Sequence, residues 1–79
     1  MTLDQYKVEI NKMLDNLDEI DKNHDYDGYL ESLNKLSETI SHAMKKYDDN
    51  SLVVLDKYII FTIRLFELAI DCDVITLKS

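Results

Sequence analysis

The first third of the chain places apolar residues three and four positions apart, which is the spacing of one helix face. These residues are Leu3, Tyr6, Ile10, Met13, Leu17 and Ile20. So narrow a stripe is typical of a helix that packs as in a coiled coil. Thr2 and Gln5 are spaced as a capping box at its start. The pattern predicts a helix over residues 2–22.

A second stripe with the same spacing predicts a helix over residues 26–47. Its members are Tyr26, Tyr29, Leu33, Leu36, Ile40, Ala43 and Tyr47. Asp25 or Asp27 can cap its start by accepting a backbone N–H. Because only a short connection separates the two predicted helices, we expect them to form an antiparallel hairpin.

The third segment, residues 51–72, is much more apolar, and we expect it to form the central helix. At 100° per residue its charged side chains fall within about 100° of the circumference, which leaves an apolar arc of about 220°. The arc holds two stripes, each of which would be covered by one helix of the hairpin. One stripe contains Val54, Tyr58, Phe61, Leu65, Leu68 and Cys72, with Cys72 expected in the core, and the other contains Leu52, Leu55, Ile59, Ile63, Phe66 and Ile70.

The predicted fold is therefore all-α: one domain over residues 1–79, in which the helical hairpin packs on a long, very apolar third helix. The chain has no Pro and a single Gly, so it lacks the turn residues that an all-β domain needs. A core of this size barely offsets the entropy lost on folding. We therefore expect the exposed part of the third helix to pair two chains as a homodimer.

Several features point to a cytoplasmic protein without catalytic activity or a cofactor. The only cysteine is Cys72, and the first residues do not resemble a secretory signal. The one apolar run of membrane-spanning length, residues 52–70, contains four charged residues. The sequence offers no catalytic triad, no Gly-rich phosphate loop and no zinc-ligand spacing.

The net charge of −7 is concentrated in one place, which we call the acidic tip. Residues 15–31 hold seven acids against one base, Lys22. Acids in the last turns of a helix oppose the macrodipole, and local rules are broken most often at functional sites. We interpret the cluster as a partner-binding surface, with a solubilising surface as the alternative. The acids are Asp15, Asp18, Glu19, Asp21, Asp25, Asp27 and Glu31.

Residues 23–34 resemble the calcium-binding loop of an EF-hand. Asn23, Asp25 and Asp27 fall at loop positions 1, 3 and 5, and Gly28 at position 6. Asn34 replaces the bidentate Glu of position 12, so the resemblance implies at most weak calcium binding. We assign no metal ligand here. The alternative is an ordinary hairpin whose Gly and Asp residues form the turn.

Three functions follow from these patterns. The leading hypothesis is an inhibitor that docks the acidic tip on a basic, nucleic-acid-handling protein, by analogy with phage anti-restriction and anti-CRISPR proteins or toxin-immunity proteins. The charge disfavours direct binding to nucleic acid or to an anionic membrane. The alternative is a structural interaction module or a secretion or assembly chaperone that uses the apolar face of the third helix. The third is a weak calcium-binding module. Charge reversal at the tip, against polar substitution at Ile60 or Ile63, would separate the first two.

Overall fold

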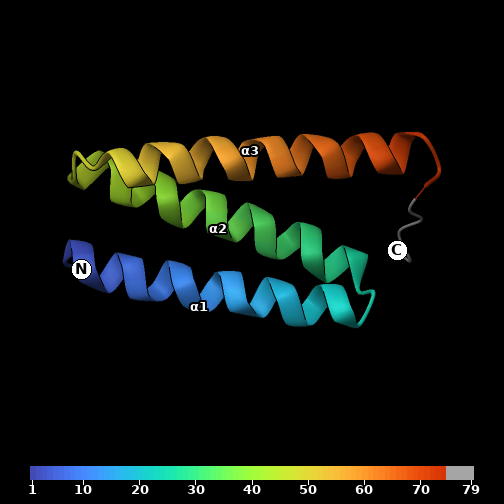
Figure 1. The fold of residues 1–79 in the computed structure, drawn as a ribbon, viewed down its shortest axis with the longest axis horizontal. Coiled ribbons are helices and arrows are strands. Elements are labelled where there is room, and N and C mark those ends of the chain that lie inside the picture. The colour runs from blue at the N-terminus through green and yellow to red at the C-terminus, as the bar shows by residue number, and fades with distance from the viewer. Residues whose placement is uncertain (75–79) are drawn as a thin grey trace.

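Three helices in a computed structural model account for most of the chain (Figure 1), which the structure describes from residue 1 to residue 74. They are α1 (Leu3–Lys22), α2 (Tyr26–Lys46) and α3 (Asn50–Asp71). Each begins and ends within one residue of the predicted position, and the described residues contain no strand. The predicted all-α, three-helix bundle is confirmed.

Each helix begins at a side chain that accepts a free backbone N–H. At α1, Gln5 donates its amide to the Thr2 hydroxyl at 3.2 Å, and the Gln5 side chain accepts the Thr2 amide at 2.8 Å, which completes the predicted capping box. Asp25 caps α2 by accepting from the amide of Gly28 at 3.2 Å. Asp49 caps α3. Such caps each contribute about 1 kcal/mol, so they fix where the helices start.

The turn between α1 and α2 is a Schellman motif that lacks the usual glycine. The amide of His24 donates to the carbonyl of Asp21 at 3.0 Å, and the amide of Asp25 donates to that of Ile20 at 3.3 Å. His24 holds the left-handed position, with φ at 56°. The C-terminus of α3 has the same form, with Asp73 at φ 59°. Non-glycine residues therefore carry a conformational cost at both helix ends.

The middle helix of the bundle is α2, so our expectation that the third helix is central was wrong. Both α1 and α3 pack on α2, and no Cα atom of α1 lies within 8 Å of one of α3. Figure 1 shows α2 running between its two neighbours. Side chains of α2 are accordingly the most deeply buried, with Leu36, Ile40 and Ala43 completely inaccessible.

Only one of the two apolar stripes of α3 reaches the core. Leu52, Ile59 and Phe66 of the second stripe are buried. The first stripe lies on the outside, and Cys72, which we expected in the core, is exposed. The reason is that α3 packs on one helix and not on two, so only the half of its apolar arc that faces α2 is covered.

The charged residues of α3 distinguish it from a membrane-spanning helix. They include Asp56, Lys57, Arg64 and Glu67. None of the helices in the described part of the chain is both long enough and apolar enough to cross a bilayer.

Truncation of matched leucines tests which helix is central. Leu36→Ala in α2 should lower the free energy of unfolding by about 2–5 kcal/mol, because it leaves a cavity in the core. Leu65→Ala in α3 should change it by less than about 0.5 kcal/mol, because that side chain is exposed. Urea unfolding at a protein concentration low enough to keep the chain monomeric measures both. Equal losses would mean that α3 is covered on both sides.

Glycine at the α1–α2 turn should stabilise the protein. His24→Gly removes the left-handed strain and should raise the free energy of unfolding by about 1 kcal/mol. For a domain of this size the melting temperature should rise by about 4–8 °C. His24→Ala is the control, because alanine keeps the strain and should give no increase. A lower melting temperature for His24→Gly would show that the imidazole ring stabilises the turn.

Candidate protein-binding surfaces

The most unusual surface of the molecule is a line of exposed apolar side chains along α3, which we call the α3 stripe. Its five large side chains are between 50% and 68% exposed. Their spacing alternates between three and four residues, as in the seam of a coiled coil. The α3 stripe consists of Val54, Tyr58, Phe61, Leu65, Leu68 and Cys72.

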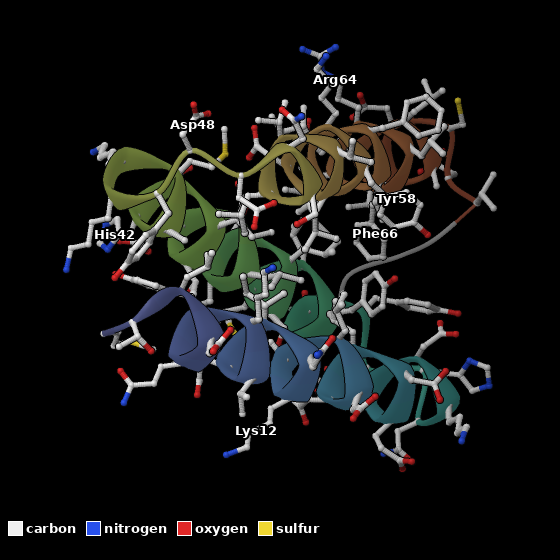
Figure 2. The ribbon with its side chains drawn as sticks, turned by 60° about the vertical axis from the view of Figure 1, so that its left-hand side comes forward. Lys12, His42, Asp48, Tyr58, Arg64 and Phe66 are labelled. Carbon is white, nitrogen blue, oxygen red and sulfur yellow. The ribbon has the colours of Figure 1, made fainter. Side chains whose placement is uncertain are left out.

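The α3 stripe faces away from α2, because the opposite side of the helix is anchored in the bundle. Phe66 packs against Tyr29 of α2, with ring centroids 5.4 Å apart. In Figure 2 Phe66 points into the bundle, whereas Arg64 points out of it. At the side-chain areas typical of these residue types, the α3 stripe exposes on the order of 500 Å² of apolar surface. That is near the largest apolar patch that a monomeric protein usually exposes.

An apolar groove between α1 and α3 adjoins the α3 stripe. It has a volume of about 770 Å³ and opens to solvent. Ile10 and Leu14 line it from α1, and Leu55 lines it from α3. Val54 and Tyr58 belong to both the groove and the α3 stripe, so the two form one continuous apolar surface.

An ion pair closes the groove at the start of α3. Lys7 of α1 lies 3.0 Å from the carboxylate of Asp49, which also accepts hydrogen bonds from the hydroxyl and the amide of Ser51. The hydrogen bond from the Ser51 hydroxyl and the one from Lys7 lower the pKa of Asp49 from 3.8 to about 2. The pair links α1 to the N-cap of α3 at one end of the groove.

The acidic tip forms where α1 ends and α2 begins, as predicted. Lys22 is shared between Asp18 at 3.5 Å and Glu19 at 3.6 Å, and all three side chains are exposed. Lys35 pairs with Glu31 at 3.3 Å, on the outside of α2. The C-terminal end of α3 lies at the same end of the bundle (Figure 1). Five of the seven acids gather at the turn itself: Asp18, Glu19, Asp21, Asp25 and Asp27, whereas Asp15 and Glu31 lie further along α1 and α2.

A small cleft connects the acidic tip with the α3 stripe. Asp18, Asp21, Tyr29 and Tyr58 line it. Burial, and the nearby carboxylate of Asp21, raise the pKa of the Tyr29 hydroxyl. Because Tyr58 is also a member of the α3 stripe, a partner on α3 would lie beside the carboxylates of α1. The sequence pattern did not indicate that the two candidate surfaces meet.

Residues 23–34 do not fold as an EF-hand loop. Since α2 begins at Tyr26, Asp27, Gly28 and Glu31 all lie in helix and not in a loop. The alternative, a hairpin whose Gly and Asp residues form the turn, is correct for Asp25, which caps α2, but not for Gly28, because His24 holds the left-handed position and Gly28 has no positive φ. Among residues 1–74 no group of three His, Cys, Asp or Glu side chains is placed to hold a metal ion.

Comparison of the chain with protein-family models, with curated proteins and with solved structures found no match. The surfaces described above are therefore the basis for assigning a function.

Acid titration tests the role of Asp49. A carboxyl group whose pKa is lowered by folding stabilises the native state above its unfolded pKa, and this contribution is lost as the pH falls towards the folded pKa. Wild type should therefore lose its advantage over Asp49→Asn between about pH 4 and pH 2. The urea midpoints of both proteins at pH 7, 4 and 2 measure this. A constant difference across that range would exclude a role for the charge.

Proposed function

We propose that this protein is a non-enzymatic, cytoplasmic interaction module that binds other proteins through the α3 stripe. One observation carries the proposal: the half of α3 that faces away from α2 exposes a continuous line of large apolar side chains. Exposed patches of this size are often functional. The spacing suits an apolar helix as the bound element, because helix pairs pack along such seams.

The flanking charges on α3 support binding in a defined orientation. Lys57, Arg64 and Asp71 follow one edge of the α3 stripe and are exposed. Apolar centres with a charged rim are typical of protein interfaces, in which the rim contributes orientation and association rate more than affinity.

The acidic tip supports a second candidate, an inhibitor that docks on a basic, nucleic-acid-handling protein. Its specific support is that Asp18 and Glu19 share one lysine while Asp21 has no basic partner among the described residues. A basic protein surface would neutralise these charges. The cleft at Tyr58 lets one partner contact both surfaces. An acidic cluster also occurs on surfaces without partners, so the α3 stripe is the stronger candidate.

Site-specific photo-cross-linking tests the α3 stripe in living cells of the source organism. A photoreactive phenylalanine at position 61 should form discrete adducts with protein, because Phe61 is exposed at the middle of the α3 stripe. His42, on the exposed side of α2, is the matched control and should form none. Adducts at position 42 but not at position 61 would contradict the proposal.

Charge reversal tests the acidic tip. The triple variant Asp18→Lys, Glu19→Lys, Asp21→Lys removes charges that oppose the α1 macrodipole but also loses both pairs with Lys22. These effects are each a few tenths of a kcal/mol, so the free energy of unfolding should stay within about 0.5 kcal/mol of wild type. Binding to a basic partner should weaken about tenfold or more and depend on salt. Unchanged affinity would leave the tip as a solvated surface.

A further inference from the structure

We infer that the α3 stripe binds the α3 stripe of a second copy of this chain, with the two α3 helices antiparallel. This inference rests on the proposed function, because it names an occupant of the same surface. It is supported by the spacing of the apolar residues, by the area that they expose and by the charges beside them.

The spacing gives one antiparallel register in which every member of the α3 stripe faces an apolar or cysteine side chain. Residues separated by alternating steps of four and three occupy the two core positions of a coiled coil. Suppose that the two α3 helices are antiparallel and related by a two-fold axis at residue 63. Each a position of one copy then faces a d position of the other copy. The facing pairs are Val54 with Cys72, Tyr58 with Leu68, and Phe61 with Leu65, each formed twice.

The area fits a dimer of modest affinity. The two α3 stripes together would bury on the order of 1,000 Å², which is the lower bound for a specific protein interface. Most of that surface is aromatic or aliphatic, as in the cores of homodimer interfaces. We therefore expect dissociation in the micromolar range, below the stability of an obligate dimer.

The charges favour the antiparallel orientation. Along one edge of the α3 stripe, Lys57 of one copy faces Asp71 of the second copy, and the symmetry forms this pair twice. Both side chains are exposed, and neither has an ion-pair partner within residues 1–74. A parallel pair would instead bring the two acidic tips to the same end, where they would repel.

The remaining contacts near the axis are compatible with close packing. Arg64 of each copy meets Arg64 of the other, and Glu67, three residues further along each helix, offsets their repulsion. The other edge of the α3 stripe carries Thr62 and Ala69, which are small and uncharged. Along that edge α3 itself therefore places no charge between the two helices.

Sedimentation velocity of the full chain tests the self-pairing. With increasing concentration, wild type should approach twice the 9.3 kDa mass of one chain. Leu65→Glu should remain a monomer. Val8→Glu is the matched control, because Val8 is 54% exposed but lies on α1, and it should dimerise as wild type does. A wild-type mass of one chain at every concentration would overturn the inference.

A charge-swap pair tests the register. Lys57→Glu or Asp71→Lys alone should weaken the dimer about tenfold, because each places like charges in contact. The double variant Lys57→Glu, Asp71→Lys should restore wild-type affinity. Failure of the double variant to recover would show that these residues do not face each other. If the surface bound only an unrelated protein, the second substitution in the same chain would not restore the affinity.

Cross-linking with a short bismaleimide tests the orientation. In the antiparallel pair the two Cys72 thiols are about 27 Å apart, so wild type should not cross-link. Val54→Cys brings a new thiol beside Cys72 of the second copy and should cross-link efficiently. The same two positions within one chain are also about 27 Å apart along the helix, so the product must be intermolecular. Efficient cross-linking of wild type through Cys72 would indicate a parallel dimer and overturn the orientation.

The outcomes separate this inference from the proposed function. If wild type is monomeric but photo-cross-links to other proteins at position 61, the α3 stripe binds a different partner and only the self-pairing is wrong. If the chain is monomeric and position 61 forms no adduct, the proposed function fails as well.

Discussion

The packing of both α1 and α3 on α2, and not on each other, is the constraint on which the other features of this protein depend. α2 uses its whole apolar stripe to contact both neighbours, which explains the complete burial of Leu36 and Ile40. A helix in that position separates its neighbours, so α1 cannot cover the outer half of α3. The exposed α3 stripe is thus a direct consequence of the helix order.

Much of the fold could be predicted from the sequence because the signals are local. The three-and-four spacing, the Thr2–Gln5 capping box and the Asp caps determine helix type and ends within a few residues of chain. Which helix lies in the middle could not be predicted in the same way. The width of the apolar arc of α3 shows how much surface favours burial, but it does not show which helix, or which molecule, covers that surface.

For the candidate surfaces, too, local features could be predicted from the sequence and the arrangement of the helices could not. The acidic tip could be predicted, because its residues are close in sequence and the hairpin brings them together. The groove between α1 and α3 and the Lys7–Asp49 pair depend on how α1 and α3 are spaced by α2, and no local pattern contains that information. The sequence did not indicate that His24 adopts the left-handed conformation at the turn, because glycine is only the commonest residue there and not a requirement. Tyr58 lines both the groove and the cleft at the acidic tip and also belongs to the α3 stripe. A partner bound to α3 would therefore lie close to the charges of the acidic tip.

The central claim is that the outward half of α3 is free in a single chain and binds the same surface of a second copy. Amide chemical shifts of the ¹⁵N-labelled protein, followed over a dilution series, test it most directly. The account predicts that shifts change with concentration at Tyr58, Phe61 and Leu65, while those around His42 on the outer side of α2 stay constant. Concentration-dependent shifts confined to the acidic tip, with α3 unchanged, would contradict it.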